Sequence, residues 1–298
     1  MTLREYDAAD SLRRESDGDL KGALQKLVQE AIRECRQREQ AARSARQQWE
    51  EVLKTLPEAE RRPFALLARL EILAKIAPEQ AATVRRLRDW AESLAGEQLA
   101  HYTELFRQAL PADEILEGRL SEGYRIRHVI HVRIDDRKYR ATVGTAFQSR
   151  QLTGDISVDT VVEAVRGEIQ RLFGRPLDPE RFLVDLFKAY ELALTAHGHA
   201  GRVGEPVSLL SVHKFLVMSR QSERAFHSVD PRHFRPYPPD EFAVDLGRLL
   251  ESGHTRIDKF RLHLHPVRNA KESLFIVNFG TRVGQNYGLL SFLPSEGR

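Results

Sequence analysis

The sequence is poor in cysteine and has no long apolar run. Cys35 is the single cysteine among 298 residues, so neither a disulfide framework nor a cysteine-based zinc site can hold the fold. No segment approaches the roughly 18 consecutive apolar residues of a membrane-spanning helix. The polar beginning MTLREYDAADSLRRESDGD also lacks the apolar core of a secretory signal. We therefore expect a cytoplasmic protein without a membrane segment.

Motifs of phosphate-binding and hydrolytic enzymes are absent as well. The chain has no phosphate loop ending in Gly-Lys-Ser/Thr, no nucleophile elbow and no GxGxxG after an expected strand. Asp185 and Lys188, in VDLFK, fall in an expected helix, whereas a carboxylate nuclease would use a strand at this place. The sequence predicts neither a cofactor nor a catalytic residue and favours a non-enzymatic protein.

Charge is sorted along the chain, although the formal net charge is only +3. Residues 1–120 carry 20 Lys and Arg against 22 Asp and Glu. The remaining residues carry 26 against 21 and contain ten of the eleven histidines. The basic excess therefore belongs to the second part of the chain, where a polyanionic partner is most easily accommodated.

The first 118 residues have helical periodicity. From Gly18 to about Leu56, apolar residues recur at spacings of three and four, which predicts one long helix packed along a narrow seam against another helix. The seam consists of Leu20, Leu24, Leu27, Ala31, Ala42, Ala45, Trp49 and Val52. Further helices are expected at about 57–76 and 78–110, each beginning at a proline. We expect an elongated, coiled-coil-like hairpin or bundle over residues 1–118, which would contact a protein partner or a second copy.

Near Ser121 the apolar period changes from about 3.6 to 2, which predicts a domain boundary and an α+β domain over 121–298. Its first part, 121–175, should contain a basic hairpin followed by a helix. Its second part, 178–298, should contain several helices and then a hairpin formed by FRLHLHPVRN and SLFIVNFG, with a turn around Asn269. Helices followed by a hairpin are the element order of a winged helix.

Local signals define the helix ends of this domain. Ser157 and Asp178 are the expected N-caps of the first two helices. Gly174 and Gly253 should lie just past helix ends, where glycine adopts backbone conformations that other residues avoid.

The segment YRIRHVIHVRIDDRKYRATVG, residues 124–144, alternates apolar and basic residues. One continuous first strand would place Ile130, Val132 and Ile134 on one face and Arg125, Arg127 and Arg133 on the other. A turn at 136–137 would set Arg133 directly opposite Arg140. Because facing like charges cost from a few tenths to about 1 kcal/mol, we expect an anion to lie between them.

A phosphate backbone is the anion that this cationic face fits best, because binding it releases counterions. The predicted nucleic-acid-binding residues are Arg125, Arg127, His131, Arg133, Lys138 and Arg140. Tyr124 and Tyr139 belong to the apolar face, so the contact should be insensitive to base sequence. Two alternatives remain open: the chain's own acids Glu114, Glu117 or Glu122 neutralise the face, or water alone solvates it.

Histidine pairs offer a different interpretation. His263 and His265, in RLHLHPVR, project from one strand face, and His128 and His131 belong to the basic segment. Imidazole suits zinc or iron, but a catalytic site needs a third ligand, and no carboxylate follows at a recognisable spacing. A metal-dependent hydrolase or nuclease is therefore kept as an alternative, and no metal is predicted.

The segment DEFAVDLGRLLES occupies the place of a DNA-recognition helix, yet its composition does not suit a groove. Burial of its apolar residues Phe242, Leu246, Leu249 and Leu250 would leave Glu241, Asp245, Arg248 and Glu251 pointing outward. A mostly acidic face cannot contact phosphates favourably. This observation favours an interaction module over a winged-helix transcription regulator, which we keep as an alternative.

These features together predict a non-enzymatic accessory subunit that contacts nucleic-acid backbone without sequence specificity. The architecture resembles that of helper subunits of large DNA-handling ATPase complexes, including those of bacterial defence systems.

Overall fold

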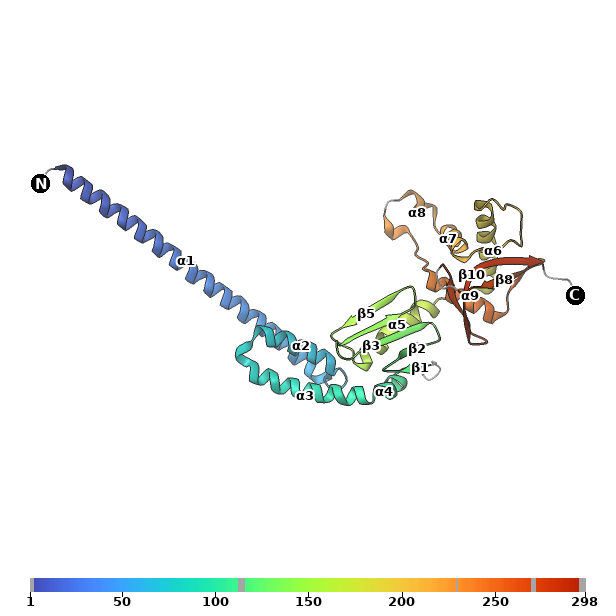
Figure 1. Cartoon of the computed structure of the whole chain (residues 1–298), viewed down its shortest axis with the longest axis horizontal. Helices are drawn as coiled ribbons and strands as arrows, with labels where there is room; N and C mark the ends of the chain where they lie inside the picture. The colour runs from blue at the N-terminus through green and yellow to red at the C-terminus, as the bar shows by residue number, and fades with distance from the viewer. Residues whose placement is uncertain (1–2, 112–115, 229, 269–271, 295–298) are drawn as a thin grey trace. The chain divides into compact units, whose positions relative to one another are not determined.

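The computed structural model describes residues 3–111, 116–228, 230–268 and 272–294. The fold is α+β, with a long N-terminal helix and a five-stranded antiparallel sheet, as Figure 1 shows. Contacts divide the chain into two compact units, Met1–Glu97 and Gln98–Arg298. None of the described helices combines the length and the apolar character that crossing a membrane requires.

The first unit is helical. Its elements are α1 (Leu3–Thr55), the 3-10 helix η1 (Leu56–Glu58), α2 (Pro63–Ile76), the 3-10 helix η2 (Pro78–Gln80) and α3 (Ala81–Ala100), whose end passes into the second unit. Prolines stand in the first turns of η1, α2 and η2, as predicted. The end of α1 packs against α2, and Val52, Phe64 and Leu70 are buried there.

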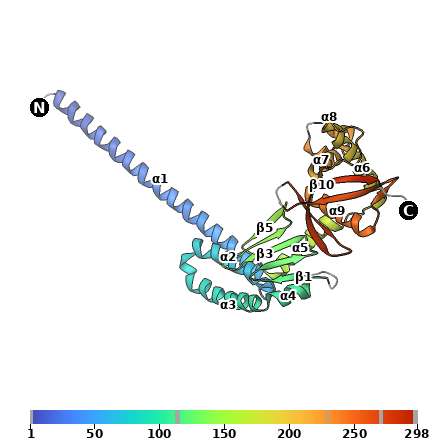
Figure 2. The ribbon, with the colours of Figure 1, turned by 45° about the vertical axis from the view of Figure 1, so that its right-hand side comes forward.

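Helix α1 begins well before Gly18 and continues unbroken to Thr55 (Figure 2). Along its described middle part the seam predicted from the sequence is exposed: Leu24 and Leu27 each show more than half of their surface to solvent, and so does the neighbouring Val28. The Leu20 side chain lies outside the described residues. Only the end of the seam, around Val52, is buried, so the apolar positions farther toward the N-terminus remain available for contact.

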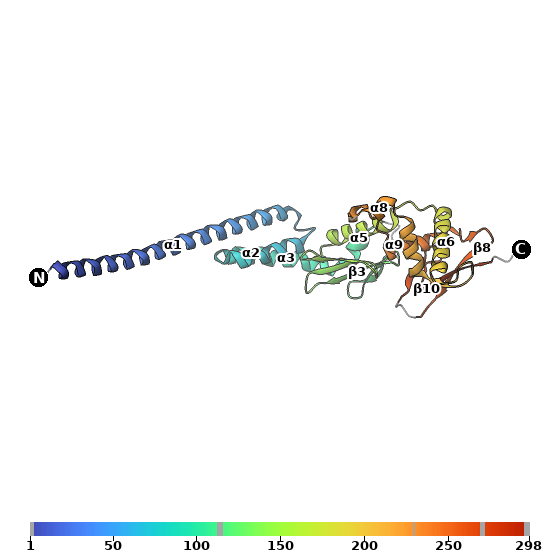
Figure 3. The same cartoon turned by 90° about the horizontal axis from the view of Figure 1, so that it is seen from above.

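The second unit opens with a five-stranded antiparallel meander. Its elements are α4 (Tyr102–Ala109), β1 (Leu116–Arg119), β2 (Gly123–Ile126), β3 (Ile130–Asp135), β4 (Arg140–Gly144), β5 (Ser149–Thr153) and α5 (Val158–Phe173). The strands are neighbours in sequence order. Helix α5 covers one face of the sheet (Figure 3), and α4 packs on the same side through Phe106, whose ring lies 4.9 Å from that of Tyr124. The opposite face carries the basic residues.

The rest of the second unit combines helices with a second antiparallel sheet. Its elements are α6 (Pro179–Ala196), β6 (Val207–Ser208), α7 (Leu209–Ser219), α8 (Glu223–His227), η3 (Pro231–His233), α9 (Pro239–Ser252), β7 (Arg256–Ile257), β8 (Phe260–Pro266), β9 (Leu274–Asn278) and β10 (Val283–Pro294). The long strand β10 pairs with β6, β8 and β9. The predicted pairing of β8 with β9 is therefore wrong, since both strands pair with β10. The turn predicted around Asn269 lies outside the described residues.

The predicted helix ends are confirmed in position, but Gly174 follows α5 with an ordinary helical φ of −72°, so the special backbone conformation expected there is wrong. The Asp178 carboxylate accepts a hydrogen bond from the Arg181 amide at 3.1 Å, and Gly253 ends α9 with a φ of 73°. Ser157 precedes α5, but its side chain makes no capping hydrogen bond. Asp155 accepts hydrogen bonds there from the Ser157 amide at 3.0 Å and from the Thr160 hydroxyl at 2.6 Å.

Candidate nucleic-acid interface

The basic segment forms three strands, whereas the sequence predicts two. The chain reverses at Arg127 and His128, which have φ values of 49° and 63°, so that β2 pairs with β3 and Arg125 lies opposite His131. The Arg127 guanidinium lies 4.6 Å from the centre of the Phe173 ring, a cation–π contact with the end of α5. The assignment of Arg127 to the cationic face is therefore wrong, because a turn replaces the continuous strand.

The predicted register of β3 and β4 is wrong by two residues. Val132 pairs with Val143, Arg133 with Thr142, and Arg140 with Asp135. The connection from Asp135 to Arg140 has four residues and passes through Tyr139 with a φ of 48°, which moves the strands relative to a two-residue turn. Because the shift is even, the apolar face is unchanged. Arg133 and Arg140 do not face each other directly, so their mutual repulsion cannot be the argument for an anion.

The open face of the meander nevertheless gathers three exposed arginines. Register and alternation place Arg125, Arg133 and Arg140 on the same side of the sheet, opposite the face that α5 covers. None of the three forms an ion pair with a carboxylate among the described residues. Glu117 and Asp135 lie across from Arg125 and Arg140 in the strand register, but their nearest cationic partners in the described part of the chain are His128 and Lys138.

The acidic residues expected to neutralise this face have other partners. Glu117 lies 3.2 Å from Nδ1 of His128, and Glu122 forms an ion pair with Arg119. Glu114 lies outside the described residues. Lys138, in the β3–β4 connection, is 3.8 Å from an Asp135 carboxylate oxygen, and both side chains are exposed. A pair of this kind contributes little to stability, so Lys138 can exchange its partner for another anion.

His131 lies between Arg125 and Arg133. Partial burial lowers the pKa of its imidazole, and the positive charges of the two arginines lower it further. The imidazole is therefore neutral at neutral pH.

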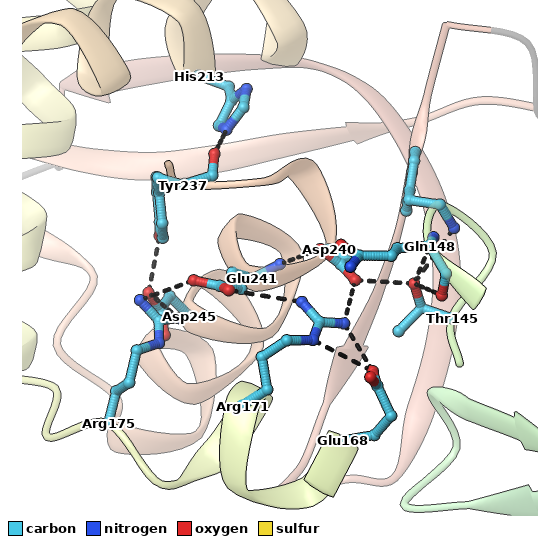
Figure 4. A network of polar contacts seen from close by, with 11 residues as sticks. Thr145, Gln148, Glu168, Arg171, Arg175, His213, Tyr237, Asp240, Glu241 and Asp245 are labelled. Atoms are coloured by element: carbon cyan, nitrogen blue, oxygen red, sulfur yellow. Dashed lines mark hydrogen bonds and ion pairs between the residues drawn. The ribbon is translucent and has the colours of Figure 1, made fainter. Parts of the chain in front are cut away.

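The arginines of α5 have a different environment, shown in Figure 4. The Arg171 guanidinium donates to Glu168 at 2.7 Å and to the buried carboxylate of Asp240 on α9 at 2.6 Å. Asp240 also accepts a hydrogen bond from the Thr145 hydroxyl at 2.9 Å. Burial acts to raise the pKa of Asp240, but these hydrogen bonds outweigh it and hold the pKa below its usual value.

A second part of the same network follows one turn along α9. Arg175 lies 3.1 Å from Glu241 and 3.2 Å from Asp245, and the Tyr237 hydroxyl donates to Asp245 at 2.7 Å. Asp245 is 3% exposed. The expectation that Glu241 and Asp245 point outward is therefore wrong, because α5 packs against α9, and Arg171 of α5 and Arg175 just past its end are their partners. Helix α9 is a packing element of the unit.

A cavity of about 310 Å³ opens beside the cationic face. Its lining residues come from the open sheet face, from the β4–β5 connection, and from α9 and β9: Arg125, Val129, His131, Thr145, Ala146, Phe147, Asp240, Ala243, Val244 and Phe275. Most of these side chains are apolar. Phe147 is 44% exposed. Sequence analysis missed this site, because its walls are assembled from segments about 100 residues apart.

The two histidines of β8 contact each other and the neighbouring strand β10. The rings of His263 and His265 are 4.7 Å apart, and Nε2 of His265 lies 2.9 Å from the Ser291 hydroxyl. In the described ranges, no group of three or more His, Cys, Asp or Glu residues is placed to hold a metal ion. His128 contacts Glu117 at the β2–β3 turn, so the structure does not bring the histidines of the two sheets together.

Comparison with known proteins does not extend these observations: no family model matches the sequence, and no curated protein or solved structure is significantly similar to it.

Proposed function

We propose that this protein is a non-enzymatic accessory subunit of a nucleic-acid-handling complex and that the open face of its meander contacts the sugar-phosphate backbone. The observation that carries the proposal is the placement of Arg125, Arg133 and Arg140 on one exposed face without a described carboxylate partner. Lys138 adds a cation at the edge of this face, and His131 adds a titratable group at its centre.

Backbone contact follows from the chemistry of these groups. Guanidinium groups donate to phosphate oxygens and release condensed counterions, so affinity should fall steeply with salt. Three arginine contacts predict a slope of about −3 for the logarithm of the duplex binding constant against the logarithm of salt concentration. A face that is merely solvated would bind no nucleic acid, even at low salt.

A salt titration with a matched pair of variants tests the proposal. Fluorescence anisotropy of a labelled duplex should give the expected slope for the full chain. Replacing Arg125, Arg133 and Arg140 with Gln should reduce the affinity at low salt at least about tenfold and flatten the slope. The control variant Arg33→Gln/Arg36→Gln/Arg85→Gln removes the same charge from exposed positions of the first unit. Equal affinities of the two variants would contradict the proposal.

For the first unit we propose a docking role, in which the exposed apolar residues of α1 contact a helix of a protein partner or of a second copy. Leu24, Leu27, Val28 and Ile32 are 47% to 62% exposed and recur at helical spacing, which favours helix-to-helix packing. Light scattering over a range of concentrations tests the second copy, and Leu24→Gln/Val28→Gln should abolish any self-association. Self-association that survives this double substitution would place the contact elsewhere.

The winged-helix description of the C-terminal region belongs to the same set of proposals. It is supported by the order α6, β6, α7, α9, β8, β10 and by the sheet order β6-β10-β8. A winged-helix transcription regulator would need α9 free to enter a groove, and the ion pairs of Asp240 and Asp245 with α5 argue against that use. Selection of a consensus duplex preferred about a thousandfold over random DNA would favour the regulator instead.

A further inference from the structure

We propose that the nucleic acid bound by the open face is single-stranded and that the cavity beside Arg125 receives one of its bases. This inference rests on the proposed function and names the substrate class of the same site.

The cavity and the cationic face are joined. Arg125 and His131 line the cavity, and together with Arg133 they also line a neighbouring depression. Glu117 and Glu122 border that depression as well, and their cationic partners are His128 and Arg119. A phosphate held at Arg125 therefore lies at the mouth of the cavity. The remainder of that nucleotide can turn inward, while the neighbouring phosphates continue along the face toward Arg133.

The walls of the cavity suit the flat face of a base. Phe147 and Phe275 contribute aromatic rings, and Val129 and Val244 contribute aliphatic surface. Stacking on an aromatic ring is open to every base, because every base has a π face. Phe147 is 44% exposed although it borders this cavity, which leaves its ring accessible to a ligand.

Two polar groups of the cavity wall, Thr145 and Asp240, are already engaged with each other and with α5. The Thr145 hydroxyl donates to Asp240, and that carboxylate is bound by Arg171 as well. Neither group is free to read the edge of a base, so stacking in this cavity should not discriminate between base sequences. We therefore still expect binding to be insensitive to base sequence, but for a different reason: aromatic rings are present, and they come from segments outside the basic strands.

The cavity distinguishes single strands from duplexes. A base in a duplex is paired and stacked, and its extrusion costs a few kcal/mol. A base in a single strand meets a much smaller barrier. The flat cationic face alone has no reason to prefer either form, so a preference for single strands would come from the cavity.

Hydrogen bonds of Thr145 fix the loop that carries Phe147. The Thr145 hydroxyl oxygen accepts hydrogen bonds from the amides of Phe147 at 3.2 Å and Gln148 at 3.1 Å. Its own hydrogen bond to Asp240 ties the loop to α9. An ordered aromatic wall reduces the entropy lost on binding.

The test compares single-stranded and duplex probes of equal length, using the full chain. Labelled oligo-dT and oligo-U represent the two sources of single strands, and a mixed-sequence duplex represents the paired form. We expect at least one single strand to bind about fivefold or more tightly than the duplex. Phe147→Ala should lower single-strand affinity about 5- to 100-fold, the worth of one stacked base, and leave duplex affinity unchanged.

Two further variants sharpen the result. Phe226→Ala removes an exposed phenylalanine from α8, away from the cavity residues, and should change neither affinity. Phe147→Trp should restore single-strand affinity, and its added fluorescence should be quenched by the oligonucleotide if a base stacks on it. Absence of quenching together with unchanged affinity in Phe147→Ala would overturn the inference.

The outcomes separate this inference from the proposed function. Salt-dependent binding of the duplex and the single strands with equal affinity, unaffected by Phe147→Ala, would refute base insertion and leave backbone contact standing. An apolar side chain of a protein partner would then be the better occupant of the cavity. Failure of the native chain to bind either form would refute the proposed function itself.

Discussion

Two groups of arginines in the second unit lie in opposite environments. Arg171 of α5 and Arg175, two residues past its end, each contact at least two carboxylates of the same chain and hold this segment to α9 (Figure 4). Arg125, Arg133 and Arg140 lie on the open face of the meander without a described carboxylate partner. The difference separates arginines that stabilise the fold from arginines that are available to a ligand.

Burial explains the difference physically. A charge that leaves water must be compensated, so Asp240, which is 3% exposed, requires Arg171 nearby. An exposed guanidinium keeps its hydration and needs no internal partner. The two groups should therefore respond oppositely to mutation: the first in stability, the second in affinity.

The largest effect is expected from Arg171→Ala. Its removal leaves the buried Asp240 carboxylate without its cation, and the free energy of unfolding should fall by about 3 kcal/mol. Urea denaturation followed by circular dichroism measures this loss. Arg133→Ala is the control and should change stability by no more than about 0.5 kcal/mol. Similar losses in both variants would remove the distinction between the two groups.

Arg127→Ala tests the arginine that the sequence assigns to the cationic face and the structure places against Phe173. Loss of its cation–π contact with Phe173 should destabilise the second unit by about 1 kcal/mol. Nucleic-acid affinity should stay within a factor of two of the native value. Native stability combined with weakened nucleic-acid binding in this variant would show that Arg127 belongs to the cationic face.

The pH dependence of binding sharpens the account of the open face. His131 has a lowered pKa in the free protein, so it is neutral at pH 7 and gains its proton only as the pH falls below the ordinary value of 6.5. A bound phosphate favours the charged form, so affinity should rise severalfold from pH 7.5 to pH 5.5. Anisotropy titrations of the native chain and His131→Gln measure this rise, which the variant should lose. An equal rise in both proteins would assign the titration to another group.

The smallest effect is expected for the stability of the variant in which Arg125, Arg133 and Arg140 are all replaced by Gln. Exposed positions away from the core usually shift stability by less than about 0.5 kcal/mol each. Its thermal unfolding should therefore nearly match that of the native chain. A large stability loss would show that these side chains have internal partners and belong with Arg171.

The alternation of the basic segment was sufficient to predict which residues face the core. Ile130, Val132 and Val143 are buried as expected, because period-two patterning is a local property. The break at Arg127 and His128 could not be predicted, since neither residue belongs to the glycine, asparagine and aspartate group that marks positive φ. That break, and the four-residue connection before Arg140, changed which side chains are neighbours.

The contacts between distant segments were beyond single-sequence reasoning. Arg171 and Asp240 are 69 residues apart, and nothing in either local sequence indicates the other. The outward placement predicted for Glu241 and Asp245 is therefore wrong, whereas Glu251 is exposed as expected. The cavity wall at Phe147 escaped notice for the same reason, because its other walls come from α9 and β9.

The Thr145 hydroxyl links these two regions through its hydrogen bonds to the Phe147 amide and to Asp240. A displacement of Asp240 will be transmitted through one side chain to the loop that bears the cavity's aromatic wall. The buried ion pair of Asp240 with Arg171 thus helps to hold the loop that forms one wall of the cavity. A substitution of Arg171 should therefore alter the position of the Phe147 loop, and with it ligand binding, as well as the stability of the fold.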